Sequence, residues 1–247
     1  VDVNVLASSE DKNFSYIPKN FEIPSNLDYL HYTSNNTIYG TQFQKQLVAD
    51  VPVVCDMSSD IFSQEINVAD FDLIYAGAQK NLGPAGATLY IVKEEALGKF
   101  KTPFMPTYMN LAKQHEKESM LNTPPVFSVY VAMLNLRELL ATGGVKAAEE
   151  RNNAKAALLY NEIDRNPLFT SKVAVEDRSK MNVSFVLKDE YAALEESFNK
   201  AWNDAGIVGL KGHRSTGGYR ASLYNALPLS SVQVLVDVMN DFATKNA

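Results

Sequence analysis

The sequence predicts an α/β fold in which part of a large mixed-sheet domain is followed by a small α+β domain. Short β-rich segments alternate with helical patterns through roughly the first 140 residues, two long helical patterns follow, and strands and helices alternate over about the last 80 residues. The chain has 247 residues, 46% of them hydrophobic, which is enough for one large core or two modest ones. We therefore expect a large domain over residues 1–144 and a small domain, including the helix that leads into it, over 145–247.

Four strands are predicted in the large domain, at residues 27–33, 51–56, 71–79 and 87–93. The segments VPVVCD at 51–56 and LIYA at 73–76 are apolar almost throughout, which is typical of strands covered on both faces. We therefore expect a parallel or mixed central sheet.

Two helical patterns follow these strands. The first covers 123–144, where Pro124 and Pro125 fit the first turn and Gly143 fits the end. The second covers 145–165 and is more polar, and its length predicts a helix that connects the two domains. The remaining elements are predicted as a strand at 182–187, a helix at 190–206, a strand at 218–225 and a last helix at 230–244.

The composition argues against several classes of function. With 23 Lys and Arg against 29 Asp and Glu the net charge is −6, so no excess of cations is available for a nucleic acid or an anionic membrane. No apolar segment approaches the length of a membrane span, and a single cysteine, Cys55, forms no intrachain disulfide. A cytoplasmic location is therefore expected. No metal site is predicted, because His31, His115, His213 and Cys55 show no ligand spacing.

Two side chains at strand ends are candidates for chemistry. Lys80 lies in LIYAGAQKNLGPAG, beside glycines that let the backbone approach a ligand. Most loop lysines are solvated, but a partly desolvated amine can form a Schiff base with an aldehyde. Asp56 ends the strand at 51–56, on the edge where open α/β sheets bind ligands. Its carboxylate is either a turn or helix-capping group or the partner of a pyridine nitrogen.

Two further segments carry polar or basic side chains. HYTSNNTIYGTQ at 31–42 follows a strand and by itself is a polar loop. GHRSTGGYRASLYN at 212–225 places His213, Arg214 and Arg220 close together in an otherwise acidic chain. Arginine suits a bidentate contact with carboxylate or phosphate, and a solvated edge with its counter-ions is the alternative interpretation.

Together these segments resemble the phosphoserine aminotransferase family. HYTSNNTIYGTQF, CDMSSDIFS, IYAGAQKNLGPAG, NTPPVFSVY and GLKGHRSTGGYRASLYNAL follow the order of that family over essentially the whole chain. The string AGAQKNLGPAG is similar to one that separates this family from other class V aminotransferases. The resemblance implies the type I, aspartate aminotransferase-like fold of the pyridoxal-phosphate-dependent transferases, with pyridoxal 5′-phosphate as the cofactor.

The resemblance also implies roles at the cofactor. Lys80 would form the Schiff base and move a proton between the substrate α-carbon and the cofactor C4′ carbon. Asp56 would pair with the pyridinium nitrogen. Thr37 would hydrogen-bond the phenolic oxygen of the ring, and Gln79 would reach the cofactor phosphate.

A homodimer with shared active sites is a further implication of the resemblance. Asn122 and Thr123 would contact the cofactor phosphate of the partner subunit. Arg220 would bind the substrate α-carboxylate. His213 and Arg214 would bind the phosphate end of phosphoserine, again across the interface.

The implied reaction converts L-glutamate and 3-phosphohydroxypyruvate to 2-oxoglutarate and 3-phospho-L-serine, in serine biosynthesis and, for some relatives, in vitamin B6 (pyridoxine) synthesis. One alternative is another class V aminotransferase with a different substrate, against which His213 and Arg214 argue. A second alternative is an inactive truncated chain. Family members carry a further segment of roughly a hundred residues before the position that matches Val1. That segment includes a phosphate-binding turn, a ring-stacking aromatic and a His-Arg pair, so the chain is expected to be a fragment.

Overall fold

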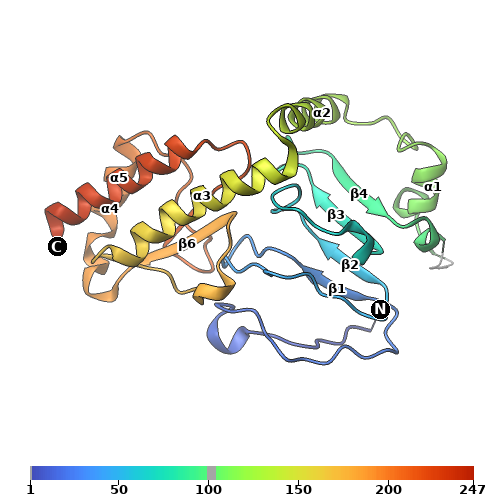
Figure 1. Ribbon diagram of the computed structural model, residues 1–247, viewed down its shortest axis with the longest axis horizontal. Coiled ribbons are helices and arrows are strands. Elements are labelled where there is room, and N and C mark those ends of the chain that lie inside the picture. Colours follow the sequence, from blue (N-terminus) through green and yellow to red (C-terminus); the bar gives the residue numbers. More distant parts are fainter. Residues whose placement is uncertain (1, 99–103) are drawn as a thin grey trace.

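Two β-sheets organise the chain, and a long helix connects them in the computed structural model (Figure 1). The structure describes residues 2–98 and 104–247. The strands are β1 (Leu30–Thr33), β2 (Val53–Asp56), β3 (Leu73–Gly77), β4 (Thr88–Val92), β5 (Phe169–Thr170), β6 (Asn182–Leu187) and β7 (Tyr219–Ser222). The α-helices are α1 (Leu111–Glu116), α2 (Val126–Ala141), α3 (Gly144–Arg165), α4 (Glu195–Asp204) and α5 (Leu229–Asn246). Short 3₁₀-helices lie at Glu10–Lys12, Val68–Asp70, Glu94–Ala96, Thr107–Met109, Val175–Asp177 and Asp189–Leu194.

The larger sheet is mixed, as the sequence predicts. Its order is β1-β2-β3-β4, in which the first three strands are parallel and β4 is antiparallel to β3. The register aligns Thr33 with Asp56, and Asp56 with Tyr75. The carboxyl ends of three strands therefore meet at one edge of the sheet.

One face of this sheet forms the first hydrophobic core. Val53, Cys55, Ile74 and Ala76 point into a buried cluster that also includes Ala132 of α2. Alternate residues of β2 and β3 are buried and half-buried, so in the described chain one face is fully covered and the other is only partly covered, where the sequence predicts cover on both faces. The reason is that α2 and the segment after β2 pack on one face only.

The opposite face of the sheet carries polar and aromatic side chains. His31 is exposed, and its Nε2 lies 3.0 Å from the Tyr75 hydroxyl oxygen. Tyr75 also lies beside Tyr90 of β4, with ring centroids 6.4 Å apart. Asp56 belongs to this half-exposed face, because it aligns with Tyr75 across β2 and β3.

The smaller sheet is antiparallel, in the order β5-β6-β7, and it packs against α3, α4 and α5. Its core is aromatic. Phe198 of α4 is 4.8 Å from Phe169, 5.0 Å from Tyr219 and 5.1 Å from Phe242, measured between ring centroids. This cluster forms the second hydrophobic core.

Helix α3 extends from the end of α2 to the smaller sheet (Figure 1), and it contacts α2, α5 and β6. It follows a sharp turn in which Gly143 has a φ of 97°, a backbone conformation that favours glycine. Apolar side chains such as Leu159 and Ile163 bury one side of α3 in the second core. The domain boundary predicted between residues 144 and 145 falls at the start of this helix and stays a prediction.

A buried polar cluster joins the two sheets. The Asn35 side-chain amide donates to Ser59 Oγ and to Asn182 Oδ1, both at 2.8 Å. Ser179 Oγ donates to Asn35 Oδ1. Each of these side chains is at most 2% exposed, so the cluster positions β6 against the loops of the larger sheet.

The structure also contains elements that the sequence pattern did not indicate. Helix α1 and strand β5 are too short to show a period. The helix predicted at 190–206 begins as a 3₁₀-helix, and α4 itself starts at Glu195. Among the helices of the described residues, none is long and apolar enough to cross a bilayer.

Candidate active site

The candidate site lies at the carboxyl ends of the parallel strands. Thr33, Asp56 and Gly77 are the last residues of β1, β2 and β3. The loops that follow these strands carry Thr37 and Lys80 to the same edge of the sheet. This arrangement confirms that Asp56 stands at the carboxyl edge, as the sequence predicts.

A single helical turn after β3 presents Lys80. The backbone N–H of Leu82 and that of Gly83 both donate to the carbonyl of Ala78, at 3.2 and 2.7 Å. A Cβ at Gly83 would lie 3.3 Å from the backbone of Ala132, so α2 packs closely against this turn. The short loop and the adjacent helix thereby fix where the lysine side chain begins.

The amine of Lys80 is half-buried and has one hydrogen-bond partner in the described structure. Its Nζ donates to Thr37 Oγ1 at 2.8 Å. Burial lowers the pKa of Lys80, the positive charge of Arg220 lowers this pKa further, and the carboxylates of Asp56 and Asp60 oppose the shift. A lysine with a lowered pKa spends more time as the neutral, nucleophilic amine.

Asp56 makes the turn contact that was one of its two interpretations from the sequence, and its role as the partner of a pyridine nitrogen stays a prediction. Its Oδ1 accepts a 2.8 Å hydrogen bond from the backbone N–H of Ser58, which is the turn geometry. Its carboxylate also faces the half-exposed side of the sheet. The carboxylate is close enough to Tyr75 to affect it: burial is the main cause that raises the pKa of Tyr75, and the charge of Asp56 is the second. The carboxylate is thus held by the turn and still directed at the site.

Arg220 reaches this site from the smaller sheet. It lies on β7, and its Nη1 donates to the backbone carbonyl of Thr37 at 3.2 Å. The Nε of Arg220 is buried and has no hydrogen-bond partner in the described structure. Thr37 therefore contacts Lys80 through its side chain and Arg220 through its backbone.

Gln79 lies beside this cluster on the exposed side of the Lys80 turn. Its side chain folds back over Gly77, where a Cβ would come within 2.7 Å of Gln79 Oε1. Asn122 and Thr123 are exposed before α2, and the Asn122 side-chain amide donates to the Thr123 carbonyl at 3.0 Å. No hydrogen bond or ion pair within the described residues links Asn122 or Thr123 to Lys80.

His213 and Arg214 lie in a tight turn before β7. The backbone N–H groups of Thr216 and Gly217 both donate to the His213 carbonyl at 2.9 Å. A Cβ at Gly212 would be 2.1 Å from the Gly217 carbonyl oxygen, so this position requires glycine. Among the described residues, no hydrogen bond or ion pair links His213 or Arg214 to Lys80.

Comparison with known proteins identifies the family. The model of the class V aminotransferases matches residues 1–235. The chain is 58% identical over 241 residues to the phosphoserine aminotransferase of Flavobacterium johnsoniae, covering 98% of this chain and 67% of that protein. The chain belongs to the phosphoserine aminotransferase family.

Other phosphoserine aminotransferases match the chain over a similar length. The Porphyromonas gingivalis phosphoserine aminotransferase is 55% identical over 245 residues, covering 99% of this chain and 68% of that one. The phosphoserine aminotransferase structure from Bacillus circulans subsp. alkalophilus superposes with a TM-score of 0.95 at 41% identity, covering 100% and 69% of the two chains. A pyridoxal-phosphate-bound one from Trichomonas vaginalis has a TM-score of 0.92 at 34% identity, covering 97% and 68%. The chain thus spans about two thirds of the length of these family members.

The residues of this family member fit a pyridoxal phosphate group. An amine with a hydroxyl partner suits an aldehyde, because Lys80 is partly desolvated yet makes no ion pair in the described structure. A carboxylate on the open sheet face suits a pyridine nitrogen. Asp56 is half-buried, on the face of the sheet opposite the first hydrophobic core, where its carboxylate is accessible.

Sequence reasoning missed a hydrogen-bonded set beside Lys80. Asn81 Oδ1 accepts from the Asn225 backbone N–H at 2.8 Å, and Asn225 Oδ1 accepts from the Asn152 side chain at 2.8 Å. The ammonium of Lys155 donates to the carbonyls of two residues after β7, each at 2.8 Å. Of these residues, only Asn81 could have been suspected from the sequence, because it is next to the candidate lysine. Asn152 and Lys155 lie on a polar helix and look solvated in the sequence.

Proposed function

We propose that this chain carries the residues of a phosphoserine aminotransferase that exchanges an amino group between L-glutamate and 3-phosphohydroxypyruvate. The proposal rests on family membership and on one observation in particular. That observation is the half-buried Lys80 amine, 2.8 Å from Thr37 Oγ1, on the sheet edge that also carries Asp56. Pyridoxal phosphate, when bound, supplies an aldehyde and an electron-withdrawing pyridine ring.

Lys80 is proposed to bind the cofactor aldehyde and then to move a proton between the substrate α-carbon and the cofactor C4′ carbon. Its lowered pKa supports this role, because a general base must be unprotonated at working pH. Thr37 holds the amine before substrate arrives and has a hydroxyl proton to offer the phenolic oxygen.

Asp56 is proposed to keep the pyridine nitrogen protonated, and the turn hydrogen bond from Ser58 holds its carboxylate in place. Gln79, exposed beside Gly77, is proposed to contact the cofactor phosphate. Arg220 is proposed to bind the α-carboxylate of the amino-acid substrate. The unpartnered Nε of Arg220 supports this role, because a buried donor is stabilised by an acceptor that a carboxylate supplies.

A second copy of the chain is proposed to complete each site. Asn122 and Thr123 would contact the partner's cofactor phosphate, and His213 and Arg214 would contact the substrate phosphate. This proposal is supported by the exposed apolar side chains of α2 next to Thr123, among them Phe127 at 73% exposed. A phosphate dianion would pair with the guanidinium of Arg214, whereas serine would leave that donor without a partner.

Visible absorption with added pyridoxal phosphate tests this proposal. We expect a cofactor absorption band that phosphoserine changes and alanine leaves unchanged, and no such band for Lys80→Ala, which should still fold. Lys200→Ala is the matched control, because Lys200 is exposed on α4, where its amine pairs with Asp204.

Three outcomes would argue for other interpretations. A response to alanine equal to that to phosphoserine would favour a different class V aminotransferase. The absence of any band would favour a chain that is inactive by itself. An unchanged band in Lys80→Ala would contradict the assignment of the lysine. Location in the cytoplasm and a role in vitamin B6 synthesis stay predictions.

A further inference from the structure

Ser34, directly after β1, has more acceptors around it than it has protons. Its Oγ lies 2.5 Å from Asp60 Oδ1 and 3.1 Å from the carbonyl oxygen of Asp56, and both distances are within hydrogen-bonding range. A serine hydroxyl carries a single proton and accepts two hydrogen bonds. Both contacts are hydrogen bonds only if one of the other two groups supplies a second proton, and a backbone carbonyl has none to give.

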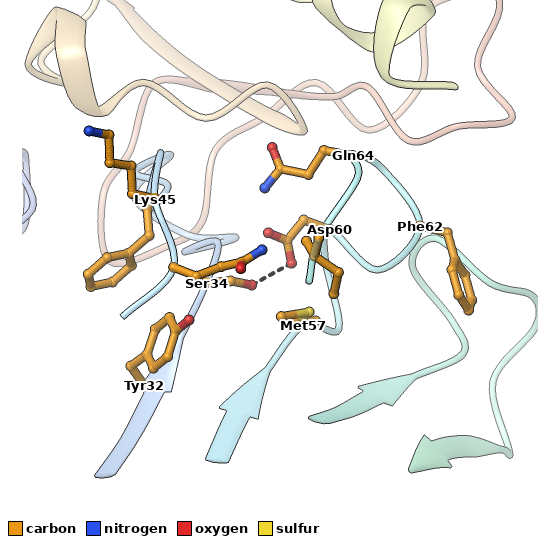
Figure 2. Close-up of a pocket in the computed structure, with 10 residues that line it drawn as sticks. Tyr32, Ser34, Lys45, Met57, Asp60, Phe62 and Gln64 are labelled. Atoms are coloured by element: carbon orange, nitrogen blue, oxygen red, sulfur yellow. Dashed lines mark hydrogen bonds between the residues drawn. The ribbon is translucent and has the colours of Figure 1, made fainter. Parts of the chain in front are cut away.

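Asp60 is the group that can supply it. Its side chain is only 6% exposed, and no Lys, Arg or His lies within ion-pair distance of it in the described structure. Figure 2 shows Asp60 and Ser34 turned toward each other above β1 and β2, while the amine of Lys45 points away. The remaining oxygen of Asp60 accepts from the neutral side chain of Gln42 at 3.3 Å. A buried carboxylate without a cation is unfavourable, whereas a carboxylic acid in this position is not.

We propose that Asp60 is a protonated carboxylic acid in the folded protein and acts as a positioning residue for the candidate active site. Its proton is donated to Ser34 Oγ, and Ser34 in turn donates to the Asp56 carbonyl. The backbone N–H of Ser34 donates to the same carbonyl at 3.0 Å, and the chain of two hydrogen bonds adds to that contact at the end of β2, which carries the Asp56 side chain. The structural part stands by itself, and the catalytic part rests on the proposed function.

The electrostatic surroundings of Asp60 agree with this assignment. Burial raises the pKa of Asp60 to about 7, although the hydrogen bonds with Ser34 and Gln42 lower it, and the nearby charge of Asp56 adds a smaller increase. The other titratable groups that face it are Lys80 from the β3 loop, Cys55 on β2 and Tyr32 on β1. Burial raises the pKa values of both Cys55 and Tyr32, so these two groups stay neutral beside it.

A neutral Asp60 has a consequence for Lys80. An ionised Asp60 favours the ammonium form of Lys80, as Asp56 does. Protonation of Asp60 removes that contribution and leaves Asp56 as the carboxylate at the strand ends. Asp60 thereby supplies a hydrogen bond to the site without adding a second negative charge near the lysine.

The pH dependence of stability tests the protonation without any need for activity. If Asp60 keeps its proton up to about pH 7 in the folded state and up to about pH 4 in the unfolded state, the folded state binds more protons between these values. Stability therefore falls as the pH rises through this range and levels off above it. Asp60→Asn lacks this dependence, so the Tm of the native protein should fall relative to that of the variant from about pH 4 to about pH 7.

Asp177→Asn is the matched control. Asp177 is similarly buried, at 4% exposed, but its carboxylate pairs with Lys19 at 3.3 Å and accepts from the Ile17 backbone N–H at 2.9 Å. Its replacement should lower the Tm with no decline of the native protein's advantage as the pH rises. A constant difference in Tm between the native protein and Asp60→Asn from about pH 4 to about pH 7 would overturn the proposal.

Infrared difference spectroscopy and kinetics provide independent readouts. Near pH 6 we expect a carboxylic-acid carbonyl band that is lost in Asp60→Asn and retained in Asp177→Asn. Above about pH 7 the ionisation of Asp60 should remove its proton from Ser34 and lower the kcat of the native protein. Asparagine can still donate to Ser34, so Asp60→Asn should keep kcat within about twofold and lack this decline, whereas Asp60→Ala should lose about tenfold in kcat. Equal losses of kcat in Asp60→Asn and Asp60→Ala would refute the positioning role. The absence of the carboxylic-acid band from the native protein would refute the protonation of Asp60. Absence of transamination in every variant together with an intact acid band would refute only the proposed function.

Discussion

The side-chain oxygen of Asn81 accepts a 2.8 Å hydrogen bond from the backbone N–H of Asn225. Asn81 directly follows the candidate lysine, and Asn225 lies shortly after β7, the strand that carries Arg220. This bond therefore joins the two halves of the candidate site, which are far apart in the sequence. The Asn225 side chain extends the contact, because its amide donates to the Phe62 carbonyl at 2.9 Å.

Asn81→Ala is expected to weaken both stability and turnover. It removes the acceptor of the Asn225 N–H and the donor to the Ile61 carbonyl, so two polar groups lose their partner. Each loss costs about 1–3 kcal/mol in the free energy of unfolding. Asn81→Asp keeps the acceptor and should recover part of the loss in chemical denaturation. Asn203→Ala, on the surface of α4, is the control, and equal stability of Asn81→Ala and Asn203→Ala would contradict the prediction.

Arg220→Lys is expected to raise KM for both the amino-acid and the oxo-acid substrate. Lysine keeps the positive charge but loses the planar fork of donors that suits a carboxylate. The loss of one charge-assisted hydrogen bond corresponds to about a 10- to 100-fold change in affinity. Steady-state kinetics would measure this change, and the cofactor absorption band should be unaffected. A KM within twofold of the native value would remove Arg220 from the substrate site.

The burial of Lys155 predicts that the free energy of unfolding rises with pH in the alkaline range. Burial, and then the charge of Arg151, lower the pKa of Lys155 to about 8 from its ordinary 10.5. Between these values the unfolded state binds more protons than the folded state, so this group makes the free energy of unfolding rise with pH, by at most about 1.4 kcal/mol per unit.

Urea denaturation from pH 8 to 10 would measure this effect as a difference between the native protein and Lys155→Met. The free energy of unfolding of the native protein should rise relative to that of the variant as the pH increases. Lys200→Met is the control, because Lys200 is exposed and its removal should give no comparable slope. A difference that stays constant with pH would show that Lys155 is charged throughout.

Mixed dimers test the proposed sharing of sites. Lys80→Ala and Arg214→Ala should each be inactive alone toward phosphoserine. If Arg214 serves the partner's site, a dimer with one subunit of each kind contains one complete site, and random mixing restores about a quarter of the native activity. Activity assays after joint refolding of the two variants would measure it. No recovery despite confirmed mixed dimers would place Arg214 in the site of its own chain.

The parts of the fold that follow from local patterns were predictable from the sequence. The apolar segment before Asp56 and the polar one after it predict a strand and its carboxyl edge, because the strand ends where the polar turn begins. The proline pair and Gly143 similarly indicate the limits of α2. The expected cover over both faces of β2 is complete on one face and partial on the other in the described chain, because an apolar segment indicates that a strand is buried and not which parts of the chain bury it.

The supporting contacts of the site were not predictable. Lys155 lies on a polar helix and looks solvated in the sequence, yet it is 1% exposed because it meets the segment after β7. Asp60 occurs in a polar turn, and its burial depends on Ser34 and Gln42 from another loop. Such contacts join residues that are distant in the chain, and no local period records them.

The placement of Arg220 on a late strand sets an order of assembly during synthesis. The ribosome delivers Thr37, Asp56 and Lys80 long before β7, and the four strands that position them come from residues 30–92. The nascent chain therefore possesses its candidate cofactor contacts before the arginine proposed for the substrate carboxylate. Loop closure over more than a hundred residues is then needed to bring β7 to that edge, so the substrate half of the site forms last.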